Sequence, residues 1–257
     1  AAQEVIEYTD IASDRVLNIS SAVGEEFAVI DYSAERIQSL KDKYSLPDEF
    51  ILSLAMIEPR KNIEALIHAY SLLPAELQQR YPMVLAYKVQ PEQLERILRL
   101  AESYGLSRSQ LIFTGFLTDD DLIALYNLCK LFVFPSLHEG FGLPPLEAMR
   151  CGAATLGSNI TSLPEVIGWE DAMFNPHDVQ DIRRVMEKAL TDEAFYRELK
   201  AHALAQSAKF SWANTAHLAI EGFTRLLQSS QEANAGQAES VTASRIQTMQ
   251  KIDALSE

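Results

Sequence analysis

Two glutamates and two glycines gather in residues 138–147, which read HEGFGLPPLE. The segment follows the apolar run 131–134, which predicts a buried strand, and its two prolines suit the first turn of a helix that ends at Gly152. Glycines between a strand and a helix N-terminus let backbone N–H groups approach an anion closely. Glu139 and Glu147 flank this turn, and carboxylates accept hydrogen bonds from hydroxyl groups. An anion with hydroxyls on both sides describes a sugar nucleotide.

A pair of cations, Arg60 and Lys61, follows another predicted strand, residues 50–56, directly ahead of a predicted helix. If the sheet is parallel, the carboxyl ends of its strands share one edge, so this pair faces the Glu139 loop. Arginine forms paired hydrogen bonds to phosphate, and lysine adds a compact charge. A charged loop pair is commonly only solvated surface. In a chain of net charge −14, however, its position favours a phosphate site.

The acidic composition, with 36 acidic against 22 basic residues, disfavours nucleic acid and anionic membrane surfaces as main partners. No apolar run reaches the roughly 20 residues that span a bilayer, and no targeting segment is evident, which favours a cytoplasmic location. Cys129 and Cys151 lack a close-spaced metal pattern and cannot build a disulfide framework. We expect two buried thiols in a reducing compartment.

Short apolar runs alternate with helical periodicity along most of the chain. This rhythm predicts an α/β fold with a doubly wound parallel sheet, which binds ligands outside the carboxyl ends of its strands. We expect Ser33 to cap the first helix of this domain. The expected strands are residues 50–56, 83–87, 111–114, 131–134, 153–156 and 172–174, and the expected helices are 34–41, 62–73, 91–104, 119–129, 144–151, 163–167 and 179–190.

The two ends of the chain read differently from this domain, which we place at residues 33–227. Residues 1–32 are interpreted as an entry segment from a missing N-terminal domain, with a short strand at 15–19. Helices at 193–208 and 212–227 form a C-terminal extension, and we expect Trp212 and Phe223 to pack against the sheet domain. Residues 228–257 read as a flexible linker and an amphipathic helix.

These motifs resemble those of the retaining glycosyltransferases of family 4, group 1, which include sucrose synthase and many lipopolysaccharide mannosyltransferases. The match is to the Rossmann-like, sugar-donor-binding C-terminal half of their GT-B fold. In that family a strand leads into EGFGLP, and seven residues separate its first glutamate from a second one. The upstream Arg-Lys pair and a downstream segment like SLPEVIG, residues 162–168 here, also match in order and spacing. The resemblance covers roughly residues 14–227.

The resemblance implies a role for each matching residue. Arg60 and Lys61 would hold the diphosphate and stabilise negative charge on the leaving nucleotide. Glu139 would contact hydroxyls of the transferred sugar, and Glu147 would accept hydrogen bonds from the ribose. Because retention implies that the acceptor attacks from the leaving-group side, the departing phosphate would act as base, and neither a metal nor another cofactor is implied.

Further contacts to the sugar nucleotide are implied for the backbone and for the strand ends. The family often has glycine where this chain has Tyr87 and Lys88, so Lys88 either supplies a charge contact or crowds the base. The residues that would lie near sugar, phosphate or base are Gly140, Phe141, Gly142, Leu143, Gly115, Phe116 and Lys88.

The same residues could also be present for structural reasons alone. Glu147 would also complement the N-terminal end of its helix, and the glycines would also serve a tight turn. For His138, packing or hydrogen bonding is favoured over acid–base chemistry, because no partner is visible in the sequence. The phenylalanines of this region are expected to anchor the core or the loop.

The sequence thus predicts the sugar-nucleotide-binding domain of a retaining hexosyltransferase that extends a polysaccharide or lipopolysaccharide. GDP-mannose is the first candidate donor and UDP-sugars are the second. A glycan or lipid-linked acceptor would bind through a missing N-terminal domain, so we expect no transfer by this chain alone; the larger protein would be cytoplasmic or peripheral at the inner membrane face. The alternatives are a degenerate, non-catalytic domain with an interaction or regulatory role, and an epimerase or phosphorylase of related fold, for which no cofactor-bearing lysine is identified.

Overall fold

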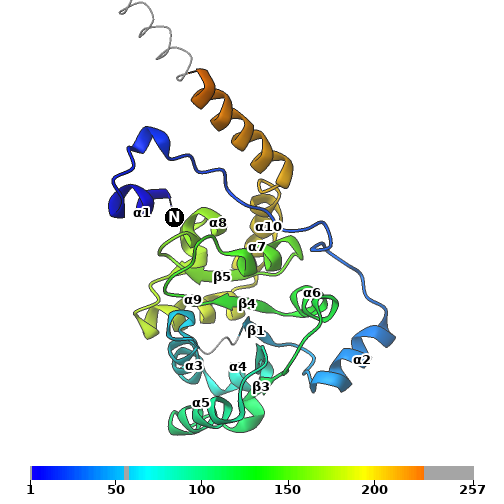
Figure 1. Ribbon diagram of the computed structural model, residues 1–257. Helices are drawn as coiled ribbons and strands as arrows, with labels where there is room; N and C mark the ends of the chain where they lie inside the picture. Colours follow the sequence, from blue (N-terminus) through cyan, green and yellow to red (C-terminus); the bar gives the residue numbers. More distant parts are fainter. Residues whose placement is uncertain (1, 55–57, 229–257) are drawn as a thin grey trace, which may run out of the picture.

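The centre of the molecule is a sheet in which every strand pair is parallel (Figure 1). The structure is a computed structural model that describes residues 2–54 and 58–228. Within these residues the sheet has six strands in the order β3-β2-β1-β4-β5-β6. The strands are β1 (Ile51–Leu54), β2 (Met83–Ala86), β3 (Leu111–Phe113), β4 (Leu131–Phe134), β5 (Thr155–Ser158) and β6 (Met173–Phe174).

Helices connect the strands and cover both faces of the sheet. Helix α3 contacts α5 and α9, whereas α7 contacts α6, α8 and α10, and right-handed crossovers place these two groups on opposite faces. The α-helices are α1 (Ala2–Tyr8), α2 (Ala34–Tyr44), α3 (Ile63–Ser71), α4 (Ala75–Arg80), α5 (Pro91–Ser103), α6 (Asp119–Leu128), α7 (Leu143–Arg150), α8 (Leu163–Ile167), α9 (Val179–Thr191) and α10 (Glu193–Ser207). The 3-10 helices are η1 (Ser13–Arg15), η2 (Pro59–Lys61), η3 (Arg108–Gln110) and η4 (Glu170–Ala172).

The strand order identifies where a ligand would bind. From the centre, the chain winds from β1 to β2 and β3 in one direction, and from β4 to β5 and β6 in the other. The loops that leave β1 and β4 therefore diverge, and in open α/β sheets the crevice for ligands lies at this switch point. This doubly wound parallel sheet confirms the predicted fold class.

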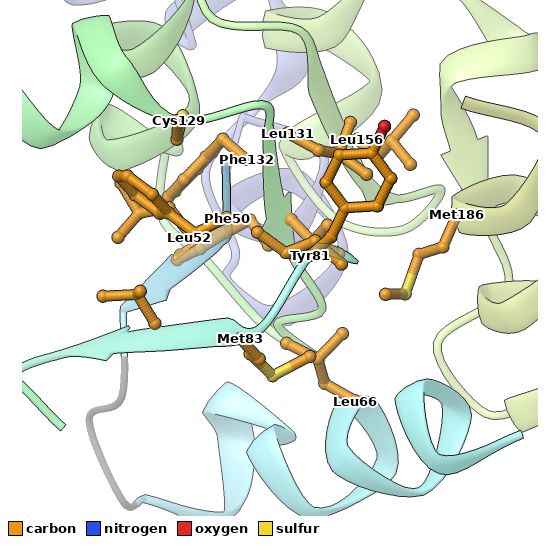
Figure 2. Packing of buried hydrophobic residues seen from close by; sticks show 14 of the residues in the cluster. Phe50, Leu52, Leu66, Tyr81, Met83, Cys129, Leu131, Phe132, Leu156 and Met186 are labelled. Carbon is orange, nitrogen blue, oxygen red and sulfur yellow. The ribbon is translucent and has the colours of Figure 1, made fainter. Parts of the chain in front are cut away.

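The hydrophobic core is continuous across the central strands, because all four residues of β2 and of β4 are buried. Figure 2 shows Met83 of β2 beside Leu66 of α3, and Leu52 near Phe132, its register partner in the neighbouring strand β4. Burying a side chain of this kind stabilises the fold by about 1.5–3 kcal/mol. Strands buried on both faces appear in sequence as short, uninterrupted apolar runs, which is why they were predictable.

An ion cluster fixes α2 against α6. The buried Asp121 carboxylate accepts hydrogen bonds from Lys43 Nζ at 2.7 Å, Tyr44 Oη at 2.6 Å and an Arg36 guanidinium nitrogen at 2.5 Å. Burial opposes ionisation of Asp121, but these hydrogen bonds outweigh it and hold its pKa well below the usual range. Ser33 caps α2 by accepting a hydrogen bond from the Arg36 amide, as predicted.

The structure corrects several predicted boundaries. The strand expected at residues 15–19 is wrong, because η1 (Ser13–Arg15) and irregular chain occupy that region. Helices α1 and α4 were not predicted, since each is only 7 or 6 residues long and lacks clear apolar spacing. Strand β5 begins two residues later than expected. Residues 55 and 56 of the first predicted strand lie outside the described residues.

The C-terminal extension is helical, as predicted, but its last helix does not pack on the sheet domain. Residues 212–228 form a helix that projects away from α10 (Figure 1). Trp212 is 58% exposed and Phe223 is 67% exposed, so the expectation that they pack against the sheet domain is wrong. The linker and amphipathic helix predicted at 228–257 lie outside the described residues from 229 onward. Across residues 2–54 and 58–228, no helix combines the length and the apolar character needed to cross a bilayer.

Candidate functional site

The loops that leave β1 and β4 are joined directly by hydrogen bonds. The Arg60 carbonyl accepts a hydrogen bond from the Leu137 amide at 2.7 Å, and Ser136 Oγ lies 3.0 Å from the same carbonyl oxygen. Both loops follow the carboxyl ends of adjacent parallel strands at the switch point. The predicted proximity of the cationic pair and the Glu139 loop is therefore present in the structure.

The predicted Arg60, Lys61 and Glu139 side chains form one polar cluster. Glu139 Oε1 lies 2.5 Å from Lys61 Nζ and 3.5 Å from an Arg60 guanidinium nitrogen. Ser136 Oγ donates a third contact to the same oxygen at 2.7 Å. The Lys61 and Glu139 side chains are only 8% and 11% exposed, whereas Arg60 is 44% exposed and also pairs with Glu58 at 2.7 Å. Arg60 is thus the accessible cation and Lys61 the shielded one.

The ion pair between Lys61 and Glu139 occupies the junction between the two loops. An anionic ligand that contacts Lys61 must therefore compete with Glu139 for the ammonium group. A nucleotide sugar offers replacements for both partners, because phosphate accepts from lysine and sugar hydroxyls donate to a carboxylate. The pairing keeps both charges compensated when no ligand is bound.

Two further loops support this cluster. After β5, Thr161 Oγ1 accepts a hydrogen bond from the Glu139 amide at 3.3 Å, and Ser162 Oγ donates to the Glu139 carbonyl at 2.9 Å. After β1, Asn62 adopts a left-handed conformation with φ of +56°, and its side-chain amide donates to the Pro176 carbonyl at 2.8 Å. Sequence reasoning missed these supports, because single hydroxyl and amide side chains carry no spacing signal of their own.

The N-terminus of α7 presents unpaired backbone donors next to the cluster. Among the described residues, the amides of residues 140–143 make no hydrogen bond, as expected for the first turn of a helix without a side-chain cap. Gly142 has φ of +112°, and a Cβ atom there would lie 2.8 Å from Leu163 Cδ2. Gly140 is exposed and open, and Leu143 is 41% exposed. This geometry suits an anion at the helix end.

Phe141 has a packing role in addition to its free amide. Its ring meets Phe210 edge to face with 5.8 Å between centroids, which confirms the predicted role as a loop anchor. His138 is exposed, and its Nε2 lies 3.0 Å from Glu4 Oε1 of α1. This contact agrees with the predicted hydrogen-bonding role of His138.

Glu147 lies in the second turn of α7, half-buried, and Tyr126 of α6 donates a hydrogen bond to its Oε2 at 3.0 Å. Burial raises the pKa of Glu147, the Tyr126 hydroxyl lowers it, and the nearby acids Asp119 and Glu26 raise it further. The sequence did not single out Tyr126, which reads there as an ordinary core aromatic.

The remaining predicted residues lie at the same edge of the sheet but away from the ion cluster. Lys88 is exposed after β2, Gly115 follows β3 with φ of +72°, and Phe116 is 73% exposed. Adjacent strands lie about 4.8 Å apart, so the end of β3 is roughly 10 Å from that of β1. Among the described residues, no hydrogen bond or ion pair joins these three to the cluster at Lys61 and Glu139.

The chain is similar in sequence to mannosyltransferases of Escherichia coli. The chain is 98% identical over its whole length to a Serotype-specific mannosyltransferase WbdA of Escherichia coli, of which it covers 32%. It is 35% identical over 225 residues, 87% of the chain, to O-antigen chain mannosyltransferase B of Escherichia coli, of which it covers 58%. The chain thus spans about a third of the length of the curated relatives that match it most fully.

A solved structure and a family model both match this chain as a glycosyltransferase domain. The C-terminal domain of a glycosyl transferase group 1 family protein (LpcC) from Francisella tularensis matches with a TM-score of 0.61 at 22% identity, covering 72% of this chain and 95% of that one. The family model described as glycosyl transferases group 1 matches residues 36–209, which include every candidate residue of the site. The chain belongs to the group 1 glycosyltransferases.

Proposed function

We propose that this chain is the nucleotide-sugar-binding domain of a retaining mannosyltransferase that extends an O-antigen polysaccharide. Family membership supports glycosyl transfer, and the printed names of two relatives, WbdA and O-antigen chain mannosyltransferase B, support mannose and an O-antigen acceptor. GDP-mannose is the proposed sugar donor, with UDP-sugars as the second candidates. The acceptor would bind to another part of a longer protein, which we propose to act in the cytoplasm.

The observation that carries this proposal is the cluster of Arg60, Lys61 and Glu139 beside the free amides of α7. In the proposed complex the diphosphate replaces Glu139 as the partner of Lys61, and Arg60 forms paired hydrogen bonds to it. As the bond between sugar and phosphate breaks, negative charge develops on the diphosphate. Both cations and the helix N-terminus then stabilise that charge, which lowers the barrier to transfer.

The two glutamates have different proposed tasks. Glu139, once released from Lys61, accepts hydrogen bonds from hydroxyls of the transferred sugar and so orients its anomeric carbon. Glu147 accepts hydrogen bonds from the ribose. Exposed Phe116 and Lys88, with Gly115, are proposed to lie beside the base. Phe116 and Lys88 are exposed and form no hydrogen bond or ion pair with the cluster among the described residues, so neither side chain occupies it, which favours a binding site over a degenerate one.

Isothermal titration of the chain with GDP-mannose and with UDP-glucose tests this proposal. We expect GDP-mannose to bind more tightly, and Arg60→Ala to weaken it about ten- to a hundredfold, since a charge-assisted hydrogen bond contributes about 1.5–3 kcal/mol. Arg80→Ala is the matched control, because Arg80 pairs with Glu49 on the surface at 3.0 Å. Absence of binding for every nucleotide sugar, or equal affinity for wild type and Arg60→Ala, would reject the proposal.

A further inference from the structure

The buried Tyr126 donates a hydrogen bond to Glu147, one of the two carboxylates of the proposed site. Tyr126 is fully buried in α6, and its ring packs edge to face on Phe132 with 5.3 Å between centroids. Phe27 of the entry segment lies on another side of the ring at 6.5 Å. The ring is therefore held in one orientation by core packing, and its hydroxyl donates a hydrogen bond to Glu147.

The Tyr126 hydroxyl occupies one of the two carboxylate oxygens of Glu147. It donates to Oε2 at 3.0 Å, whereas Oε1 has no hydrogen-bond partner among the described residues. Glu147 is half-buried, so its carboxylate is neither sealed in the core nor free to turn in solvent. A carboxylate fixed at one oxygen presents the other in a defined position.

We propose that Tyr126 is a positioning residue of the sugar-nucleotide site, whose hydroxyl holds Oε2 of Glu147 so that Oε1 accepts a hydrogen bond from the nucleotide ribose. This inference rests on the proposed function. A long glutamate side chain loses rotamer freedom when it binds a ligand. The hydrogen bond from Tyr126 restricts the Glu147 side chain before the nucleotide binds, so less binding free energy is spent on ordering that side chain.

The hydrogen bond from Tyr126 helps to keep Glu147 ionised, because the other surroundings of Glu147 raise its pKa. The titratable groups near Glu147, besides Tyr126, are Asp119 at the start of α6, Glu26 of the entry segment and Cys151, which directly follows α7. Burial and the two acids raise the pKa of Glu147, and the tyrosine hydroxyl is the contact that lowers it. Removing the hydroxyl therefore raises this pKa further, so that Glu147 is protonated at a higher pH.

The variant Tyr126→Phe removes only the hydroxyl, and Tyr70→Phe is its matched control. Tyr70 is also fully buried, and its hydroxyl donates to the Gln78 carbonyl at 2.9 Å, in a different part of the core. Both substitutions delete one buried hydroxyl, so both are expected to reduce thermal stability. Only Tyr126→Phe is expected to change nucleotide binding.

Titration calorimetry with GDP from pH 5 to pH 8 tests the inference. At pH 8 we expect Tyr126→Phe to weaken GDP binding about three- to tenfold, as for the loss of one hydrogen bond. The decline in affinity on acidification should begin at a higher pH than in wild type. With 2′-deoxy-GDP the difference between Tyr126→Phe and wild type should shrink, because a ribose hydroxyl that Glu147 would bind is missing. Tyr70→Phe should match wild type with both ligands.

Glu147→Gln separates failure of this inference from failure of the proposed function. If Glu147→Gln weakens GDP binding but Tyr126→Phe matches wild type in affinity and pH profile, Tyr126 is only a core residue and the inference is wrong. Equal losses in Tyr126→Phe and Tyr70→Phe lead to the same conclusion. If wild type itself does not bind GDP, the proposed function fails.

Discussion

Replacing Lys61 with methionine is expected to destabilise the fold, because it leaves Glu139 charged and shielded from water. Truncating one partner of a buried ion pair costs about 3–5 kcal/mol. The side chains are 8% and 11% exposed, which places this pair near the buried limit. Glu139 keeps the Ser136 hydrogen bond at 2.7 Å and an Arg60 nitrogen at 3.5 Å. We therefore expect a loss of about 2–3 kcal/mol in the free energy of unfolding.

The double variant Lys61→Met/Glu139→Gln distinguishes the ion pair from simple packing. With both charges removed, no uncompensated charge remains, so we expect the loss to shrink to about 1 kcal/mol. Glu139→Gln alone should also cost about 1 kcal/mol, because its amide oxygen can still accept a hydrogen bond from Lys61, so the coupling energy should be about 2–3 kcal/mol. Urea unfolding followed by circular dichroism at pH 7 measures each term. The surface pair of Arg80 and Glu49, 63% and 39% exposed, is the control, with coupling below about 0.5 kcal/mol. Equal coupling in the two pairs would refute the burial argument.

Three further predictions concern residues outside the ion pair. Asp121→Asn should lower the free energy of unfolding by about 2 kcal/mol at pH 7. Because the native pKa of Asp121 is depressed, its contribution is fully present above the unfolded pKa of about 3.9 and is lost progressively as the pH falls towards the native pKa. In urea melts the difference between wild type and variant should therefore be about 1 kcal/mol smaller at pH 3 than at pH 7, and an unchanged difference would contradict the assignment. Gly142→Ala should cost about 1–3 kcal/mol, given the φ of +112°, whereas Gly140→Ala, in open space, should leave the melting temperature unchanged; equal melting temperatures would contradict the strain argument. Burial raises the pKa of Cys151 to about 12 and that of Cys129 well above its usual range, so iodoacetamide at pH 8 should label both thiols only after unfolding, and rapid labelling of the native chain would contradict their burial.

The sheet was predictable from sequence because its strands are buried on both faces. Uninterrupted apolar runs such as residues 83–86 and 131–134 are typical of strands in a parallel sheet that is covered on both faces. The meeting of the Arg60 and Glu139 loops followed from the same argument, since both loops leave the carboxyl ends of strands. By contrast, α1 was missed, because seven residues without apolar spacing give no periodic signal. The packing of the last helix was misjudged, because apolar residues such as Trp212 and Phe223 look like core residues in the sequence but are exposed in the structure.

The side-chain contacts within the site could not be predicted from the sequence. Lys61 and Glu139 are 78 residues apart, and nothing in either segment indicates that they pair with each other before any ligand arrives. Tyr126 looks like any other aromatic residue of a core helix until its hydroxyl is seen 3.0 Å from Glu147. Such contacts depend on the relative placement of two helices to within about an ångström, which residue spacing does not encode.

A crystal structure of the chain with bound GDP-mannose tests the central claim most directly. We predict diphosphate oxygens within hydrogen-bond distance of Lys61 Nζ and of free amides in residues 140–143. The contact between Lys61 and Glu139, 2.5 Å without ligand, should open as Glu139 turns to the mannose hydroxyls. A nucleotide bound at another surface, with that ion pair unchanged, would contradict the account.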